Sequence, residues 1–320
     1  MCTVVIVTVT LNLALDVTYH LPEVRVHTAN RVSTVAQRAG GKGVNVARVL
    51  HALGLECLVC GFAGGHAGAA VRAELSTAGL ACRLTTIAGE TRRTLAVVDE
   101  AHGDATGFWE PGPQVSGDEW RAFLDGYDAL LSDAEAVVLC GSLPPGVPSG
   151  AYAELCSRAR AAAVPAVLDA DGDALRRGLA GRPELVKPNR DELARVAGGA
   201  DPIAGAEALR AAGAVAVVVS HGREGLIAVA GEGCWRAAPP EQVPGNPTGA
   251  GDAAVAALTA GLVRSLPWPD RLADAAALSA AAVAAPLAGD FDAELYRRYR
   301  TGVRVEALHG PSTTTGGRAG

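Results

Sequence analysis

The residues best suited to chemistry lie in Gly245-Asn-Pro-Thr-Gly-Ala-Gly-Asp252, a turn that leads directly into an apolar, helix-like segment. Gly249 and Gly251 allow a tight turn with outward N–H groups, and a helix N-terminus adds a partial positive charge. The amides of Gly249, Ala250 and Gly251 therefore predict an anion hole for a phosphoryl group. Asp252 either caps the helix or takes a proton from an attacking hydroxyl, the base that phosphoryl transfer needs.

A second glycine-rich segment, Ala39-Gly-Gly-Lys-Gly-Val-Asn45, opens another helix. Lys42 and Asn45 are three residues apart and project from the same side of that helix. The segment is not a Walker A loop, because the upstream glycine is missing, and Val46 stands where a dinucleotide fingerprint needs its third glycine. Taken alone, the segment predicts a helix entry or a binding loop, and both interpretations stay open.

Two further turns follow strand-like segments. In Lys187-Pro-Asn-Arg-Asp-Glu192 a strand ends at Pro188, Asn189 can cap the next helix and Glu192 is at the capping-box position. Ser220-His-Gly-Arg-Glu-Gly225 follows an apolar strand, and ligands bind at such carboxyl ends in open α/β sheets. Of the 28 basic residues only two are lysines, Lys42 and Lys187, and both lie in turns of this kind.

Strand-like and helix-like segments alternate along most of the chain, which predicts a parallel sheet with helices on both faces. Strands are expected at 4–11, 56–61, 136–140, 166–169, 185–187 and 215–220, and helices at 43–53, 68–78, 149–162, 173–179, 190–197, 204–212, 253–262 and 272–285. Two segments, about 16–39 and 83–109, have alternating patterns without a helix, and we expect them to form a small β-sheet over one edge of the main domain. The tail, residues 310–320, has the composition of a flexible end.

The composition excludes several partners. The 320 residues carry a net charge of −6, which provides no basic footprint for nucleic acid, and no apolar run is long enough to span a membrane. Seven cysteines, an odd number without an export signal, favour reduced thiols and a cytoplasmic location. Cys57-Leu-Val-Cys60 has metal-site spacing, but no second pair follows, which favours two buried thiols.

Taken in order, these pieces resemble the ribokinase-like PfkB carbohydrate kinases, most closely the branch that holds 1-phosphofructokinase and tagatose-6-phosphate kinase. The resemblance runs from about residue 5 to 300 and rests on Thr10-Leu-Asn-Leu-Ala-Leu-Asp16, Gly40-Gly-Lys-Gly-Val-Asn-Val-Ala-Arg48, Gly141-Ser-Leu-Pro-Pro-Gly146, Leu168-Asp-Ala-Asp-Gly-Asp-Ala-Leu175, Lys187-Pro-Asn, Ser220-His-Gly-Arg-Glu-Gly and Gly249-Ala-Gly-Asp. It implies one kinase domain over residues 1–309, a three-layer α/β/α core with a mostly parallel sheet, and a β-sheet lid through which two copies form a homodimer.

The resemblance also implies roles for the matching residues. Asp252 is the implied general base, and the amides of Gly249, Ala250 and Gly251 form the implied anion hole. The implied contacts to the sugar phosphate are Asp16, Gly41, Lys42, Asn45, Arg92 and Arg31, of which the two arginines bind the substrate's own phosphate. The implied ATP contacts are Lys187, Asn189, Ser220, Gly222, Gly225 and Gly251, and Glu192 is tied to Mg²⁺ through phosphate or water.

The chain departs from the family pattern mainly around the sugar. The family has proline, proline, asparagine, glutamate and asparagine where this chain has Leu13, Ala39, Thr94, Gly107 and Trp109. The ATP and base motifs are intact, so the sequence predicts a kinase more firmly than any one substrate.

The leading hypothesis is an ATP- and Mg²⁺-dependent kinase of a ketohexose phosphate, with fructose 1-phosphate converted to fructose 1,6-bisphosphate. Tagatose 6-phosphate, fructose 6-phosphate, an unphosphorylated sugar or a nucleoside are alternative acceptors. A sugar or nucleotide sensor without turnover is the alternative outside enzymes. The intact Gly249-Ala-Gly-Asp252 sequence argues against a sensor, because a sensor needs no base.

Overall fold

The computed structural model describes residues 5–308 of the chain. Its strands are β1 (Val5–Thr10), β2 (Ala14–Leu21), β3 (Thr34–Gly40), β4 (Cys57–Ala63), β5 (Ala81–Thr86), β6 (Arg92–Asp99), β7 (Asp104–Trp109), β8 (Ala134–Cys140), β9 (Ala166–Asp169), β10 (Leu185–Val186), β11 (Ala216–Ser220), β12 (Leu226–Ala230), β13 (Gly233–Ala238) and β14 (Arg304–Leu308). Its α-helices are α1 (Lys42–Ala52), α2 (Gly65–Thr77), α3 (Gly117–Leu131), α4 (Ala151–Ala161), α5 (Gly172–Gly178), α6 (Arg190–Ala197), α7 (Pro202–Ala211), α8 (Ala250–Val263), α9 (Trp268–Val283) and α10 (Ala293–Arg300). The expected flexible tail, 310–320, lies outside the described residues.

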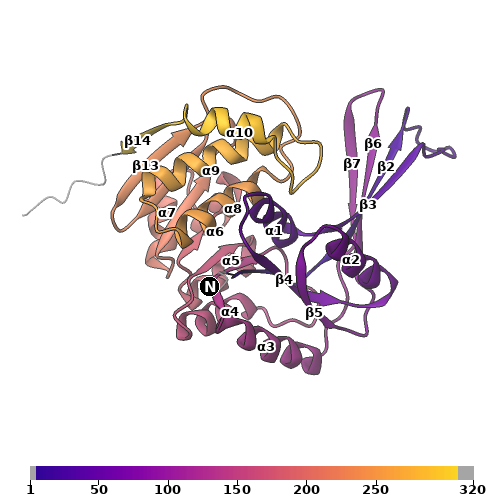
Figure 1. The fold of residues 1–320 in the computed structure, drawn as a ribbon, viewed down its shortest axis with the longest axis horizontal. Coiled ribbons are helices and arrows are strands. Elements are labelled where there is room, and N and C mark those ends of the chain that lie inside the picture. Colours follow the sequence, from indigo (N-terminus) through magenta and orange to yellow (C-terminus); the bar gives the residue numbers. More distant parts are fainter. Residues whose placement is uncertain (1–4, 309–320) are drawn as a thin grey trace, which may run out of the picture.

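The strands form two sheets (Figure 1). The large sheet has ten strands in the order β14-β13-β12-β11-β10-β9-β8-β1-β4-β5. Its strands run parallel from β5 to β11, and β12, β13 and β14 add antiparallel pairs at the other edge. Every helix and strand expected from the sequence is present; β9 and α6 have the expected bounds, and the others differ by a few residues at their ends.

Helices bury both faces of the large sheet, which explains the continuous apolar strands. One face packs against α1, α2, α8 and α9, through residues such as Val44, Val71 and Leu272. The other face packs against α3 to α7, through residues such as Phe123 and Leu155. The expected three-layer α/β/α core is therefore confirmed. Cys57 and Cys60 lie on β4 and are buried, and burial raises the pKa of their thiols to about 11 and about 12.

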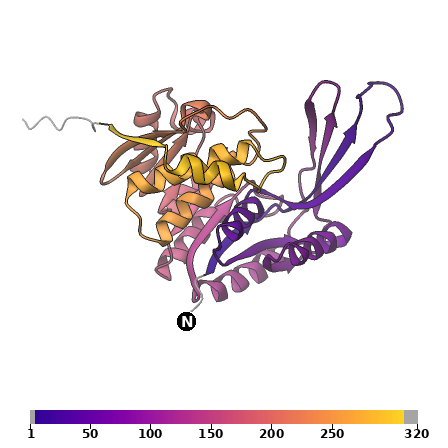
Figure 2. The same ribbon diagram turned by 45° about the horizontal axis from the view of Figure 1, so that its top comes forward.

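The small sheet, in the order β3-β2-β6-β7, projects from one end of the core (Figure 2). Its strands confirm the expectation for residues 16–39, but the second segment needs a correction. Residues 83–86, expected in the lid, belong to β5 and pair with β4 in the large sheet. Leu84 is buried there in the core, and an alternating pattern does not specify which sheet its apolar side chains join.

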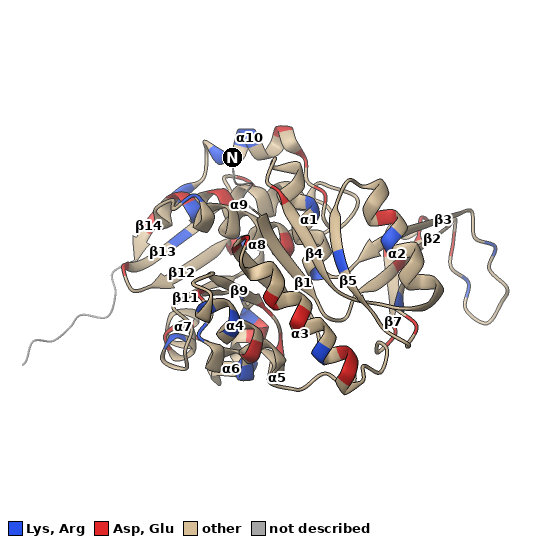
Figure 3. Cartoon of the chain, turned by 60° about the horizontal axis from the view of Figure 1, so that its bottom comes forward, with Lys and Arg blue, Asp and Glu red and all other residues tan. Residues whose placement is uncertain are grey.

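Acidic and basic residues are mixed over the same helices, α3 included, without a basic face in the view of Figure 3. Among residues 5–308, no helix is long and apolar enough to cross a membrane.

Candidate active site

Part of the expected site lies at the carboxyl ends of the parallel strands, where ligands bind in open α/β sheets. Asp169 is the last residue of β9, Lys187 directly follows β10, and Ser220 ends β11. A parallel bridge between Asn189 and Ser220 extends the sheet by one more pair. The sheet thereby brings residues that are far apart in the sequence to one edge.

The turn from Gly245 to Asp252, called the transfer turn below, enters α8 without a side-chain cap. Gly249 has φ +89°, and a Cβ on it would lie 2.9 Å from the Cα of Ala288, so only glycine fits this position. Ala250 donates its N–H to the carbonyl of Pro247 at 3.2 Å. Of the three predicted anion-hole donors, Gly249 and Gly251 are therefore the two without a partner within residues 5–308.

Asp252 lies in the first turn of α8 with 7% of its surface exposed. Its Oδ2 accepts a hydrogen bond from Nδ2 of Asn45 at 2.8 Å. Burial and the negative charge of Asp169 raise the pKa of Asp252 to about 6, although Asn45 and the two lysines act in the opposite direction. A carboxylate with this pKa is charged at neutral pH and is still basic enough to accept a proton from a hydroxyl.

This pKa predicts the acid side of the activity profile. A base acts only when it is unprotonated, so kcat/KM for the acceptor should fall about tenfold per pH unit below about pH 6. Initial rates between pH 4.5 and 8.5 measure this fall of kcat/KM on the acid side, and the stability of the protein is checked at each pH. A profile that stays flat to pH 4.5 would contradict the environment described for Asp252.

Both lysines of the chain contact one carboxylate, that of Asp169. Nζ of Lys42 is 3.3 Å from Oδ2 of Asp169, and Nζ of Lys187 is 3.6 Å from Oδ1. The side chains of Asp169 and Lys187 are 1% and 4% exposed, and that of Lys42 is 38% exposed. Burial lowers the pKa of Lys42, but Asp169, Glu192 and Asp252 outweigh this effect and raise it overall. The sequence pieces include Asp169, but no role was predicted for it.

Lys187 also places a positive charge beside the transfer turn. A Cβ on Gly251 would lie 3.5 Å from Nζ of Lys187. An ammonium group therefore lies beside Gly251, the residue that precedes Asp252 in the first turn of α8. Such fixed positive groups stabilise the charge that moves during phosphoryl transfer.

On the small-sheet side, Asp16 lies on β2 beside the start of α1. Oγ1 of Thr94 donates to Oδ1 of Asp16 at 2.6 Å. A Cβ on Gly40 would lie 1.9 Å from Oδ2 of Asp16, so glycine is needed next to this carboxylate. Gly41, with φ +112°, is the N-cap residue just before α1, and the helix carries Asn45 toward Asp252. Burial raises the pKa of Asp16, while the hydrogen bond from Thr94 and the charge of Arg92 lower it.

The two arginines predicted to bind phosphate differ in position. Arg92 lies at the start of β6, and its Nε and Nη1 donate to the carbonyl oxygens of Asn12 (3.0 Å) and Glu110 (3.3 Å). Asn12 is itself buried and donates to Oγ of Ser142 at 3.0 Å, a contact that sequence reasoning missed. Arg31 is exposed in the connection between β2 and β3 and forms no hydrogen bond or ion pair within the described range. Its role stays a prediction.

The predicted ATP contacts lie in turns that have the expected local geometry. The capping box is confirmed, because Oδ1 of Asn189 accepts from the Glu192 N–H and Oε2 of Glu192 from the Asn189 N–H, each at 2.8 Å. Gly222 and Gly225 have φ +54° and +89°, and a Cβ on Gly225 would lie 2.1 Å from the Ala237 carbonyl oxygen. This tight turn follows β11 at the same edge of the sheet.

A Mg²⁺ ion would depend on the nucleotide here. No three His, Cys, Asp or Glu side chains in residues 5–308 are grouped to hold a metal. Mg²⁺ is usually bound through one or two carboxylates together with phosphates and water. Glu192, whose Oε1 accepts no hydrogen bond from the described residues, fits such a contact.

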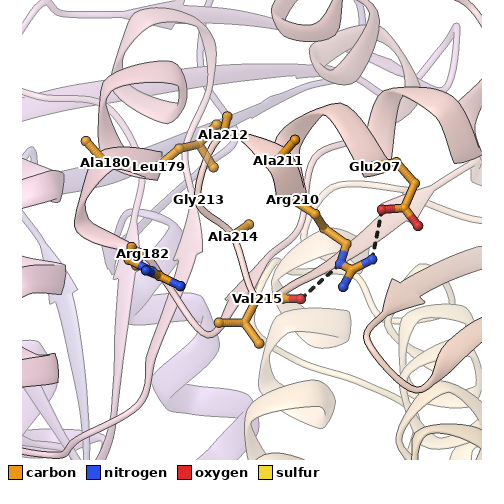
Figure 4. A pocket seen from close by; sticks show the side chains of 10 residues that line it. All are labelled: Leu179, Ala180, Arg182, Glu207, Arg210, Ala211, Ala212, Gly213, Ala214 and Val215. Carbon is orange, nitrogen blue, oxygen red and sulfur yellow. Dashed lines mark hydrogen bonds and ion pairs between the residues drawn. The ribbon is translucent and has the colours of Figure 1, made fainter.

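A cavity of about 670 Å³ lies away from this chemistry (Figure 4). Its lining includes Arg182, Arg210 and Val215, and Val215 precedes β11, so the cavity lies at the amino end of that strand. Arg210 is already engaged with Glu207 and with the Val215 carbonyl oxygen.

A proton acceptor, a turn with free amides and a lysine ammonium thus lie close together, as phosphoryl transfer to a hydroxyl requires. Fold and site together define an α/β phosphotransferase. A family model described as pfkB family carbohydrate kinase matches residues 4–294. The chain therefore belongs to the PfkB family of ATP-dependent carbohydrate kinases, as the resemblance implied.

Solved structures of the same fold include close matches. Phosphofructokinase-2 from Escherichia coli in complex with fructose-6-phosphate is 28% identical, with a TM-score of 0.84, over 94% of this chain and 99% of that chain. The tetrameric inhibited form of the same enzyme is 29% identical, with a TM-score of 0.85 and the same coverage. A possible 1-phosphofructokinase from Thermotoga maritima is 27% identical, with a TM-score of 0.82, over 95% of this chain and 99% of that chain.

Proposed function

We propose that the protein transfers the γ-phosphoryl group of ATP to a hydroxyl of a ketohexose phosphate, with fructose 1-phosphate as acceptor and fructose 1,6-bisphosphate as product. The observation that carries this proposal is the placement of Arg92 near Asp16, one alternate position from the Thr94 that lies opposite Asp16. Side chains alternate along a strand, so Arg92 and Thr94 share a face of β6, and Thr94 bonds Asp16. A guanidinium for a phosphate and a carboxylate for sugar hydroxyls thus lie together, with α1 leading from them to Asp252.

Each group then has a chemical task. Asp16 accepts hydrogen bonds from the sugar, and Asp252 accepts the proton of the reacting hydroxyl as its oxygen bonds to the γ-phosphorus. The bond from that phosphorus to the bridging oxygen breaks, and ADP leaves. The amides of Gly249 and Gly251 and the ammonium of Lys187 stabilise the transferring group. Mg²⁺, when bound with the nucleotide, supplies further neutralisation of phosphate charge.

Acceptors distinguish the candidate functions. ADP release should be measured with fructose 1-phosphate, fructose 6-phosphate, tagatose 6-phosphate, fructose, ribose and adenosine, with the Asp252→Asn protein as blank. Both fructose monophosphates yield the same bisphosphate, so kcat/KM must be compared for each acceptor separately. The highest value with fructose 1-phosphate is the expected result. No ADP release with any acceptor would favour a sensor.

Fructose 6-phosphate is the second candidate acceptor. It is favoured by the 28% identity with phosphofructokinase-2 crystallised with that sugar phosphate. A preference for it in the same panel would keep the roles of Asp252 and Arg92 and change only the position of the substrate phosphate.

Arg92→Ala should raise the KM of phosphorylated acceptors by about 10–100-fold, because a hydrogen bond to a charged group contributes about 1.5–3 kcal/mol. The KM of unphosphorylated fructose, where measurable, should not change. Arg93→Ala is the matched control, since Arg93 points to the other face of β6 and pairs with Glu110. Equal effects of the two substitutions would contradict a phosphate site at Arg92.

We also propose that two copies associate through the small sheet. Val35 and Phe108 are 55% and 58% exposed, and they share a face with Tyr19 and Leu95, their direct cross-strand neighbours. Tyr19 and Leu95 are partly buried against the core, whereas Val35 and Phe108 are exposed, as apolar side chains at an interface often are in one free copy. Sedimentation velocity should give a dimer for the wild type and a monomer for Phe108→Glu. A monomeric wild type at micromolar concentration would contradict this assembly.

A further inference from the structure

The connection between α9 and α10, residues 284–292, contacts both halves of the active site. A Cβ on Gly249 of the transfer turn would lie 2.9 Å from the Cα of Ala288 and 3.2 Å from the Gly289 nitrogen. A Cβ on Gly289, which has φ +85°, would lie 3.1 Å from the Cα of Asn45. Asn45 in turn donates to Asp252. Two adjacent residues of this connection therefore pack against the anion-hole turn and against the residue that holds the base.

The start of the same connection is tied to the transfer turn as well. The carbonyl oxygen of Val283, the last residue of α9, accepts a hydrogen bond from the Asn246 N–H at 3.0 Å. A Cβ on Gly245 would lie 2.1 Å from that oxygen. The transfer turn and the connection thus meet at two separate points and cannot move independently.

One side chain ties this connection to the small sheet. Arg38 lies on β3, and its Nη1 donates to the Ala288 carbonyl oxygen at 3.2 Å and to Oδ2 of Asp290 at 3.1 Å. Its Nη2 donates to Oδ1 of Asp290 at 2.6 Å. Two parallel bonds to one carboxylate fix orientation as well as distance, which a lysine at this position would not do.

Arg38 is also a neighbour of the acceptor site. It is directly opposite Asp16 in the register of β2 and β3, and paired residues of neighbouring strands point to the same face. The side chains of Arg38 and Asp290 are 24% and 42% exposed, so solvent screens their charges only in part. Arg38 therefore stands between the carboxylate that faces the sugar and the connection that packs on the transfer turn.

We infer that the Arg38–Asp290 pair is a latch that couples the small sheet over the acceptor to the transfer turn and to Asn45. When the small sheet lies over the acceptor, the latch fixes the positions of Ala288 and Gly289. The contacts of these two residues in turn fix the positions of Gly249 and Asn45. Arg38 and Asp290 are positioning residues, because they act through other groups. The inference rests on the kinase activity of the family, and any acceptor that the panel identifies serves to test it.

The latch predicts that acceptor and nucleotide favour each other's binding. By linkage, the acceptor then tightens nucleotide binding by the same factor by which the nucleotide tightens acceptor binding. Titration calorimetry with AMP-PNP, a non-hydrolysable ATP analogue, and Mg²⁺ measures this factor with and without saturating acceptor. We expect about fivefold or more for the wild type, within the usual range of such couplings, and a factor near one for Asp290→Asn and Arg38→Lys.

Kinetics give a second readout that a merely structural role would not reproduce. A misplacement of about 1 Å costs roughly 10²-fold in rate, so both variants should lose kcat by about 10- to 100-fold, while the KM for ATP at saturating acceptor should rise by no more than the lost coupling factor. The exchanged pair Arg38→Glu/Asp290→Arg should recover part of the loss. If circular dichroism shows that a single variant does not fold, the double variant is compared with the wild type instead.

A matched control is the pair between Arg300 on α10 and Asp274 on α9, with Nε 2.7 Å from Oδ1. Arg300→Lys and Asp274→Asn should leave both the coupling factor and kcat unchanged. Wild-type coupling and kcat in folded Asp290→Asn and Arg38→Lys would overturn the latch. Turnover by the wild type without any coupling would overturn it too. A different best acceptor would overturn only the proposed substrate.

Discussion

Asp252→Asn should lose about 10²- to 10⁴-fold or more in kcat, the range that a positioned general base contributes. Asparagine has the shape of aspartate, so the entry into α8 and the free amides of Gly249 and Gly251 should remain. It cannot accept the proton of the attacking hydroxyl. Steady-state ADP release measures the loss, and calorimetry with AMP-PNP should show nucleotide binding close to that of the wild type.

The same substitution should raise stability. The pKa of Asp252 is about 6 in the folded protein against 3.8 as its ordinary value, so the folded state prefers the protonated form. The charged form therefore destabilises the fold as the pH rises through this interval, and asparagine removes that effect. Scanning calorimetry should give Asp252→Asn a higher Tm than the wild type at pH 7.5, and a smaller difference at pH 4.

Asp125→Asn, an exposed position on α3, is the matched control and should change neither Tm nor turnover. Turnover at the wild-type level in Asp252→Asn would remove Asp252 as the base. Lost turnover with a lowered Tm would mean that the carboxylate supports the fold rather than the reaction.

Asp169→Asn should have the largest effect on the fold among the site residues. Breaking a buried ion pair costs about 3–5 kcal/mol, because the remaining charge has no partner, and here Lys187 is 4% exposed. Urea unfolding at pH 7.5 measures the change in the free energy of unfolding. The charge of Asp169 also raises the pKa of Asp252, so the acid limb of kcat/KM should move to lower pH in this variant.

Asp171→Asn provides the control two residues away. Asp171 is about half exposed, pairs with Arg195 and caps α5, and asparagine also serves as a cap. It should move neither the unfolding midpoint nor the acid limb. If Asp169→Asn also changed neither quantity, the pairing of both lysines with Asp169 would contribute nothing to the stability of the fold or to the pKa of Asp252.

Local chemistry made part of this site predictable. The glycines of the transfer turn and the capping box at Asn189 act within a few residues, so their sequence determines their geometry. Helix α3 is not among the expected elements, although Ser116 and Glu119 form a capping box and Trp120 and Phe123 are buried on one side.

Other features depend on contacts that no local pattern encodes. Arg38 and Asp290 are 252 positions apart, and Asp169 meets Lys42 and Lys187 only because β9 and β10 end beside α1. The strands β12 to β14 were also missed, since an antiparallel edge does not follow the alternation of strand and helix that marks the parallel part. Composition does point to the lysines, as the only two in an arginine-rich chain.

The placement of these two lysines has a consequence for amine chemistry. Reagents and enzymes that acylate lysine find one half-exposed side chain, held charged by its neighbours, and one buried side chain. Both pair with Asp169 in the proposed active site, and every other cationic side chain is an arginine or a histidine. If these lysines act as proposed, acylation of either one should inactivate the kinase, and bound nucleotide should slow the modification.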